Sequence, residues 1–338
     1  MRAARLTLLA LVTVVTLGAC GGSGGGDENG VRLEGAGSSL VYPLATAWSR
    51  DYDGANVVYS AAGSGSGIHL ITTRSIDFGA SDAPLTPAQA AACNGCVQIP
   101  WALSATALSY RLDGAPGTLR LSGPVLADIY LGKITHWNDP KIASLNPGAQ
   151  LPDQAITPVF RSDDSGDTYA FTSYLSKISH AWKRRVGTGT SVDFPVGVGS
   201  NGNGGVAGTI SRTDGALGFI GVAYAAANEL RVASIRNAGG RFVAPTLDGI
   251  AAAASAMSEP RRDNSISIVD PPASAPEAYP ISTFTYAIVP RGSPKASELQ
   301  RFLTYAIGPG QRFGTDLYFA ELPPQVVALN RKAIASLG

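Results

Sequence analysis

Residues 57–68 read VVYSAAGSGSGI and give the clearest indication of the fold. The apolar run 57–60 is typical of a short strand, and the glycine–serine stretch 61–67 is typical of a loop. A short helix carrying Ile68 and Ile71 on one side follows the loop. A strand, a small-residue loop and a helix in this order predict a layered α/β unit.

Similar loops open helices at two other places. The loop 35–39 (GAGSS) precedes an apolar-faced helix, and Ser39 stands where a helix N-cap is expected. A strand over 156–160 delivers the loop 161–166 to a third helix. Roughly 300 residues follow the first thirty, which is too many for one core, so we expect two lobes.

The first residues read as an export signal. Two arginines precede an apolar run over 6–17 that is shorter than the roughly 20 residues of a membrane span. Cys20 directly follows Leu-Gly-Ala, which resembles the lipobox of bacterial lipoproteins. We therefore predict a signal peptide over 1–19, and a lipidated cysteine with a flexible tether over 20–30. An ordinary cleaved signal is the alternative.

Charge and composition exclude several classes of protein. The chain has 26 Lys and Arg against 25 Asp and Glu, so no basic surplus calls for nucleic acid or an anionic surface. Hydrophobic residues make up 45% and charged residues 15%, which indicates folded cores and not disorder.

After Cys20, the sequence has only Cys93 and Cys96, in a C-x-x-C arrangement. An exported protein with one such pair is expected to form a small structural disulfide there. A redox centre or half of a zinc site is the alternative, but no second pair exists. The histidines are scattered, so no metal site is expected; they are His69, His136 and His180.

The three helix starts suggest an anion-binding site. Helix N-termini present free N–H groups, and glycine lets a ligand approach the backbone. Arg161 and Asp82 both follow short strands, where ligands bind in α/β folds. Arg161 can grip an oxyanion, whereas Asp82 tolerates only an anion that carries a proton. Phosphate carries one near neutral pH and sulfate does not, so Asp82 would select phosphate.

Catalytic motifs are missing from the sequence. Gly132-Lys133 is followed by Ile134, so there is no P-loop. The segment 63–67 has Gly65 where a serine-hydrolase elbow needs its nucleophile. These observations favour a protein that is not an enzyme.

Six segments together resemble the phosphate-binding lipoproteins of bacterial high-affinity phosphate ABC transporters, the PstS family of periplasmic binding proteins. The resemblance covers nearly all of the exported part of the chain. The segments are GAGSSLVYPLATAW (35–48), YSAAGSGSGI (59–68), IDFGASDAPL (76–85), ADIYLGKITHWNDPKI (127–142), VFRSDDSGDTYAFTSYL (159–175) and SNGNGGVAGTISRTDGALGFI (200–220).

The resemblance implies a set of phosphate contacts. Asp82 would accept the phosphate proton, Arg161 would bind the anion, and Asp163 would orient Arg161. The remaining expected contacts are the side chains or backbones of Ser39, Leu40, Ser64, Ser165, Gly166 and Asp167.

Asp167 departs from the family pattern, which commonly has a threonine at that position. Its backbone N–H could still donate to the anion, but its carboxylate must turn away or be screened. Thr168 is expected to support the site by supplying the missing hydroxyl.

The family fold is a two-lobed α/β periplasmic-binding-protein fold (Venus flytrap, type II) with a mixed sheet in each lobe. By this likeness, lobe 1 comprises 31–109 plus 284–338, and lobe 2 comprises 110–283. The runs 99–110 and 281–290 are the expected crossovers of a two-crossover hinge.

The resemblance implies a monomeric receptor that captures inorganic phosphate between its lobes and delivers it to a membrane ABC permease. The receptor would be exported and lipid-anchored at the outer face of the cell membrane or in the periplasm, with no cofactor and no nucleic acid partner. Three alternatives stay open: a receptor for another oxyanion, a secreted phosphate-ester hydrolase, and an adhesin or signalling receptor that keeps the fold.

Overall fold

The structure, a computed structural model, describes residues 30–115 and 117–338. The predicted signal peptide, Cys20 and nearly all of the tether lie outside the described residues. The described helices and strands are β1 (Arg32–Gly37), α1 (Tyr42–Asp51), β2 (Asn56–Ser60), α2 (Ser64–Thr72), β3 (Phe78–Ser81), α3 (Pro87–Cys93), β4 (Cys96–Tyr110), β5 (Arg120–Ser122), α4 (Gly123–Tyr130), α5 (Pro140–Ala143), β6 (Thr157–Arg161), α6 (Gly166–Ile178), α7 (His180–Arg185), β7 (Val198–Ser200), α8 (Gly202–Arg212), β8 (Ala216–Gly221), α9 (Val222–Ala227), β9 (Arg231–Val232), β10 (Ser234–Arg236), β11 (Phe242–Val243), α10 (Leu247–Ser255), β12 (Ser282–Pro290), α11 (Ala296–Ala306), the 3-10 turns Pro309–Phe313 and Thr315–Leu317, and α12 (Pro324–Ala335).

Most strands belong to one mixed sheet in the order β2-β1-β3-β12-β4-β8-β6-β7, with β9 also pairing β4. On one side of β4, β1 is parallel to β2 and β3, and β12 runs antiparallel to β3. On the other side, β8 is antiparallel to β4, and β6 is parallel to β7 and β8. Each half is therefore a mixed sheet, as predicted from the sequence.

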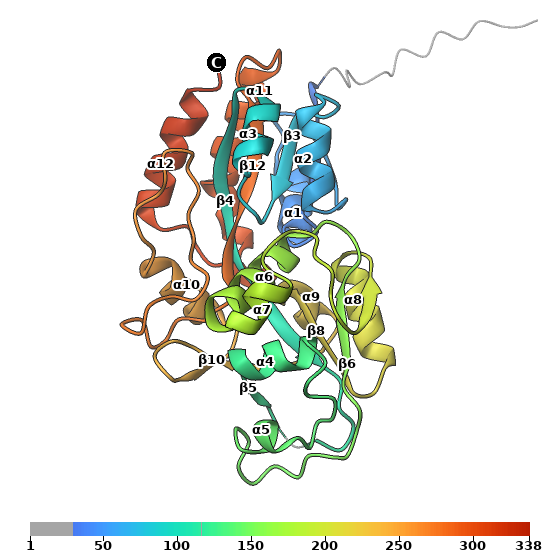
Figure 1. The fold of residues 1–338 in the computed structure, drawn as a ribbon. Helices are drawn as coiled ribbons and strands as arrows, with labels where there is room; N and C mark the ends of the chain where they lie inside the picture. Colours follow the sequence, from blue (N-terminus) through green and yellow to red (C-terminus); the bar gives the residue numbers. More distant parts are fainter. Residues whose placement is uncertain (1–29, 116) are drawn as a thin grey trace, which may run out of the picture. The chain divides into compact units, whose positions relative to one another are not determined.

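Strand β4 joins the two halves of the sheet. Its residues up to Ala105 pair with β12, and from Thr106 to Tyr110 they pair with β8. Figure 1 shows this strand running from one half into the other. The elements predicted at 99–110 and 281–290 correspond to β4 and β12.

Each half has its own group of packed aromatic rings. Trp48 and Phe78 both pack against Trp101 in the half that contains β1. Phe171 and Phe219 stack in the half that contains β8. These large side chains are fully buried, and burying each one contributes about 1.5–3 kcal/mol, so each half has a core that supports its sheet.

Two helix starts differ from the sequence prediction. The N-cap of α1 is Val41 and not Ser39, because the Ser38 hydroxyl accepts the Leu40 and Val41 N–H groups. Helix α2 begins at Ser64, within the stretch expected to be a loop. Gly63 has a φ of +89°, a conformation that glycine adopts easily, so the chain turns sharply enough for the helix to begin there.

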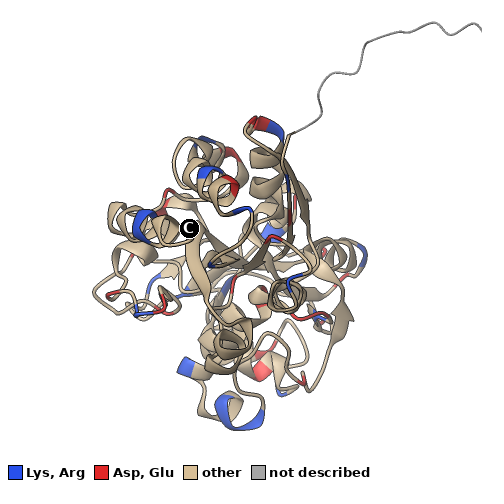
Figure 2. Cartoon of the chain, turned by 90° about the horizontal axis from the view of Figure 1, so that it is seen from above, with Lys and Arg blue, Asp and Glu red and all other residues tan. Residues whose placement is uncertain are grey.

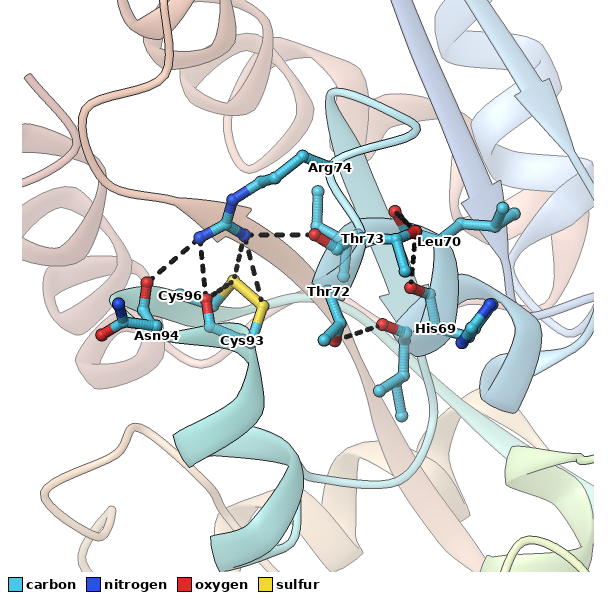
Figure 3. Close-up of a disulfide and its surroundings, with 10 residues drawn as sticks. His69, Leu70, Thr72, Thr73, Arg74, Cys93, Asn94 and Cys96 are labelled. Carbon is cyan, nitrogen blue, oxygen red and sulfur yellow. Dashed lines mark hydrogen bonds between the residues drawn. A yellow bond between two sulfur atoms is a disulfide. The ribbon is translucent and has the colours of Figure 1, made fainter.

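A disulfide joins Cys93 to Cys96 between α3 and β4 (Figure 3). The Arg74 guanidinium donates to the carbonyls of Cys93 and Asn94, at 2.8 and 3.1 Å. The disulfide and Arg74 together fix the turn from which β4 starts.

Candidate functional site

Three short strands end at the candidate site. β1 leads into the segment holding Ser38 and Ser39, β3 leads to Asp82, and β6 ends at Arg161. Parallel pairing of β1 with β3 places the first two segments at one sheet edge. Helices α2 and α6 begin at the same place, with Ser64 as the first residue of α2 and Ser165 as the N-cap of α6.

Asp82 is buried among hydroxyl groups. The Ser38 hydroxyl donates to its two carboxylate oxygens at 2.6 and 2.7 Å, and the Thr285 hydroxyl donates to Oδ1 at 2.7 Å. Ser64 Oγ lies 3.5 Å from Oδ2. Burial raises the pKa of Asp82 to about 7, the negative charge of Asp167 adds to this shift, and the Ser38 and Thr285 hydroxyls oppose it.

Arg161 is held by two carboxylates. Its Nε and Nη2 donate to Asp163 at 2.8 and 2.5 Å, and its Nη1 donates to Asp167 at 2.9 Å. Burial raises the pKa of Asp163, but the paired Arg161 charge outweighs it and leaves the pKa below its ordinary value. Asp163 also accepts the Gly202 N–H at 2.9 Å, so this pair has a fixed orientation.

The Asp167 carboxylate is screened by three donors. Besides Arg161, the Asn203 amide donates to Oδ2 at 2.8 Å and the Thr106 hydroxyl donates to Oδ1 at 2.8 Å. Burial is the main cause that raises the pKa of Asp167, and the Arg161 charge opposes it. The carboxylate is fully buried, so its screening comes from the protein and not from solvent.

The two sets of contacts meet at Ser64. Its hydroxyl accepts the Asp82 N–H at 3.2 Å and the Gly166 N–H at 3.1 Å. A Cβ built on Gly166 would come within 2.4 Å of the Asp82 Cβ. Glycine is therefore required at 166 for this close approach.

The predicted site residues come together in the structure. The Ser39 hydroxyl accepts the Asn203 amide at 3.0 Å, and Ser165 caps α6 by accepting the Asp167 and Thr168 N–H groups at 3.1 and 3.4 Å. The Thr168 hydroxyl is buried and has no hydrogen-bond partner among the described residues. The residues of the set that are at least nine-tenths buried are Ser39, Leu40, Ser64, Asp82, Arg161, Ser165, Gly166, Asp167 and Thr168.

Sequence reasoning missed four residues whose side chains hydrogen-bond to side chains of this group. Ser38 was inside the predicted loop, where Ser39 was preferred, and Asn203 was in one of the six quoted segments. Thr106 and Thr285 lie on β4 and β12, which were expected to act only as crossovers. Nothing local marks a threonine on a buried strand as a site residue, because only the folded chain brings it beside a carboxylate.

The arrangement suits a small oxyanion. It combines one arginine, several hydroxyls and two buried carboxylates of raised pKa, Asp82 and Asp167, at the start of two helices. Within residues 30–115 and 117–338, no group of three or more His, Cys, Asp and Glu side chains could hold a metal ion. No helix in this part of the chain is long and apolar enough to cross a membrane.

Comparison with known proteins defines the class first. A PBP superfamily domain matches residues 23–309. A solved structure of a high affinity periplasmic phosphate-binding protein (PfluDING) matches with a TM-score of 0.74 at 20% identity, covering 89% of this chain and 93% of that one. An ABC-type phosphate transport receptor from Vibrio cholerae matches with a TM-score of 0.55 at 19% identity, covering 86% and 100%. The chain has the two-lobed periplasmic-binding-protein fold predicted from the sequence.

Curated relatives define the family. "Phosphate-binding protein PstS" of Xylella fastidiosa (strain Temecula1) is 38% identical, over 96% of this chain and 95% of that protein. The protein of the same name from Pasteurella multocida is 39% identical over 87% of each chain, and "Phosphate-binding protein PstS 2" of Mycobacterium tuberculosis is 34% identical over 93% and 92%. The chain belongs to the PstS family of phosphate-binding proteins, as the six sequence segments predicted.

Proposed function

We propose that this protein binds inorganic phosphate between its two lobes and delivers it to the membrane permease of a phosphate ABC transporter. The observation that carries the proposal is the buried Asp82, with its pKa raised to about 7, in one site with Arg161 and the hydroxyls of Ser38 and Ser64. Relatives named phosphate-binding proteins over nearly the full length support it.

The donors would bind phosphate through local hydrogen bonds. The hydroxyls of Ser39, Ser64 and Ser165 can each rotate their proton toward an anion, and Arg161 offers its guanidinium. The N–H groups of Leu40, Gly166 and Asp167 donate to the hydroxyls of Ser38, Ser64 and Ser165 in this structure. A bound anion would replace these hydroxyls as the acceptor.

Asp82 would supply the selectivity. Once ionised, above its pKa of about 7, it is only an acceptor and can pair with a hydroxyl of protonated phosphate, whereas sulfate would place an oxygen acceptor against it. A site that leaves buried polar groups unpaired rejects the wrong ligand strongly, by roughly 10⁴-fold in comparable cases. Arsenate carries the same proton, so this argument does not separate it from phosphate.

Closure of two lobes would bury the anion. Gly65 N–H donates to the Asp164 carbonyl at 3.1 Å, and Ser64 accepts from Gly166, so α2 and α6 already contact each other. With lobe 1 as 31–109 plus 284–338 and lobe 2 as 110–283, these bonds run between lobes and the hinge passes through β4 and β12.

The protein would act outside the cytoplasm as a monomer. A signal peptide over 1–19 and acylation of Cys20 would export it and anchor it to the membrane, with 20–30 as a tether. The lipoprotein modification attaches more than one acyl chain, whereas one chain alone would hold only marginally.

We propose no catalytic activity. Ser64 and Ser165 accept backbone N–H groups, Ser39 accepts the Asn203 amide, and no histidine takes part in these bonds. Relatives that match over nearly the full chain are named phosphate-binding proteins.

Equilibrium dialysis with radiolabelled phosphate tests the proposal. We expect one phosphate bound per chain, competition by unlabelled phosphate, and no competition by a roughly hundredfold excess of sulfate, because sulfate would leave the Asp82 acceptor unpaired. Equal competition by sulfate would contradict it. Turnover of a phosphomonoester that Ser64→Ala or Ser165→Ala abolishes would support the hydrolase alternative instead.

A further inference from the structure

Asp82 continues strand β3 at a position opposite Thr285 of β12. The two strands are antiparallel and Tyr286 is opposite Ser81, so the next pair in this register is Thr285 with Asp82. Residues that face each other across antiparallel strands have their side chains on the same face of the sheet. The Thr285 hydroxyl donates to Oδ1 of Asp82 at 2.7 Å, and both side chains are buried. The pairing of the two strands therefore fixes this contact.

Two threonines of β12 bond Asp82 at different atoms. Thr283 and Thr285 are two positions apart, so their side chains lie on one face of the strand. The Thr283 hydroxyl donates to the backbone carbonyl of Asp82 at 3.1 Å, whereas the Thr285 hydroxyl donates to the carboxylate. Of the two, Thr285 alone acts on the ionisable group, and Thr283 provides a matched comparison.

The two oxygens of the Asp82 carboxylate have different surroundings. Oδ1 accepts the Thr285 hydroxyl, whereas Oδ2 lies next to the position that a Cβ on Gly166 would occupy, and 3.5 Å from Ser64 Oγ. The one proton of the Ser38 hydroxyl is shared between both oxygens. A carboxylate oxygen accepts about two hydrogen bonds. Oδ1 is thus occupied by protein donors, and Oδ2 keeps the capacity to accept on the side where α6 begins.

The ionisation of Asp82 depends on several neighbouring groups. Burial, together with the Asp167 charge, raises the pKa of Asp82 to about 7, and the Ser38 and Thr285 hydroxyls and the Arg161 charge oppose this rise. Tyr59 is a further ionisable neighbour. Burial raises the pKa of Tyr59, and the Asp82 charge adds to that shift, so Tyr59 stays neutral near pH 7.

Charges farther from Asp82 nearly cancel. A cavity of about 220 Å³ reaches Asp82, and the ionisable residues in its wall include Tyr169, Lys177, Arg261 and Tyr286. Asp270 faces Lys177, and Asp263 faces Arg261. Across the whole chain, basic and acidic residues nearly balance and are interspersed (Figure 2). Discrimination between two anions must therefore come from burial and from the groups next to Asp82.

We propose that Thr285 is a specificity-determining residue, whose hydroxyl holds Oδ1 of Asp82 as an acceptor, leaves Oδ2 for the anion, and lowers the pH above which the site prefers protonated phosphate to sulfate. This inference rests on the proposed function. A hydroxyl that donates to a carboxylate stabilises its ionised form. Ionised Asp82 accepts the proton of phosphate, whereas protonated Asp82 can donate to sulfate. Thr285 acts on the anion only through Asp82, so it is a positioning residue.

The first measurement needs no ligand. The Asp82 carboxyl is titrated by ¹³C NMR in the full chain with labelled aspartate, and its resonance is assigned by its absence in Asp82→Asn. The midpoint in the unaltered protein should lie at about 7. Thr285→Val keeps the shape of the side chain and removes the hydroxyl, so it should raise the midpoint by about one pH unit, because a hydrogen bond to the charged form is lost.

The second measurement is the preference for phosphate over sulfate across the same pH range. Each unlabelled anion competes with radiolabelled phosphate, and the pH at which the preference falls to half its alkaline value is compared between variants. Protonation of phosphate itself is the same for every variant, so it cancels in this comparison. In Thr285→Val, this pH should rise by the same amount as the NMR midpoint.

Two further variants separate the contact with the carboxylate from support of the strand. Thr285→Ser restores a hydroxyl and should return both midpoints to those of the unaltered protein. Thr283→Val is the matched control, because its hydroxyl bonds backbone carbonyls, and it should leave both midpoints unchanged. A thermal melt checks that each variant folds, and Thr285→Ala carries the same comparison if Thr285→Val does not fold.

Either of two results would overturn the role of Thr285. One is an unchanged midpoint in Thr285→Val in both measurements. The other is an equal loss of affinity for both anions at every pH, which would mean that Thr285 only supports the fold. Failure of the unaltered protein to bind phosphate would overturn the proposed function, and with it the role in specificity. The NMR titration would then still test the contact between Thr285 and Asp82, so the two failures are distinguishable.

Discussion

At the scale of single residues, Asp82 links the site to pH. Burial keeps its pKa at about 7, against an ordinary aspartate value of 3.8. The native state therefore holds this proton up to near neutral pH, whereas the unfolded chain loses it near pH 4. As a result, the free energy of unfolding of the ligand-free protein falls as pH rises from about 4 through 7.

Asp82→Asn should remove much of the stability that the protein loses as pH rises. The variant should be more stable than the unaltered protein at pH 8, with a smaller difference at pH 5, as measured by urea unfolding without phosphate. Asp193→Asn, an exposed position outside the site, is the control. A pH dependence that is the same in Asp82→Asn and in the unaltered protein would contradict the raised pKa.

Asp167 and Asp163 both pair with Arg161 but should have opposite effects on binding. Asp167→Asn removes a buried negative charge from beside the anion and should strengthen phosphate binding by roughly tenfold. Asp163→Asn loosens Arg161 and should weaken phosphate binding by a similar factor. Calorimetry on the two variants checks this, with a thermal melt to confirm folding. Weaker binding in both would contradict this and show that Asp167, like Asp163, is needed to hold Arg161.

At the scale of elements, the start of α6 has no room for a larger residue. Gly166→Ala would place a Cβ within 2.4 Å of the Asp82 Cβ, so α6 and β3 could not approach as they do. Overpacking of this kind costs about 1–3 kcal/mol. We expect this cost to weaken phosphate binding and to change the free energy of unfolding only a little. Gly204→Ala on α8, where no atom lies within 4 Å of the added methyl, is the control. Unchanged affinity would mean that this contact is not needed for binding.

The disulfide before β4 should contribute stability and not affinity. Its short ring, closed between Cys93 and Cys96, restricts the unfolded chain by about 2 kcal/mol in the loop-entropy account. Cys93→Ser with Cys96→Ser should lower the free energy of unfolding by that amount and leave phosphate affinity within about twofold, since Asp82 and Arg161 keep their partners. Urea unfolding and calorimetry measure the two quantities. A large loss of affinity would show that the turn also positions the site.

Local sequence was enough to predict the elements but not all of their contacts. The loops before α1, α2 and α6 were recognisable because glycine, serine and apolar spacing are local signals. The start of α2 at Ser64 was missed because a positive φ at Gly63 allows the helix to begin inside a loop-like stretch. Thr285 was missed because its partner Asp82 lies 203 positions away in the chain.

At the scale of the whole molecule, the site depends on segments that only the fold unites. Asn203 from α8 bonds both Ser39 and Asp167, and Thr106 on β4 bonds Asp167 where the strand passes between sheet halves. A resemblance to the family predicted Asp82, Arg161 and Ser64, which the structure brings together, but not Thr106 and Asn203, which hold Asp167. The screening of this carboxylate explains how the family site can accept an aspartate at 167.

The most direct test of the central claim compares phosphate and sulfate binding by calorimetry in the unaltered protein and in Asp82→Asn. We predict phosphate binding without measurable sulfate binding in the unaltered protein. In Asp82→Asn, phosphate should bind roughly 10- to 100-fold more weakly, since a hydrogen bond to a charged group is lost, and the preference over sulfate should shrink. An unchanged preference in Asp82→Asn, or tight sulfate binding by the unaltered protein, would contradict the account of Asp82 as the acceptor of the phosphate proton.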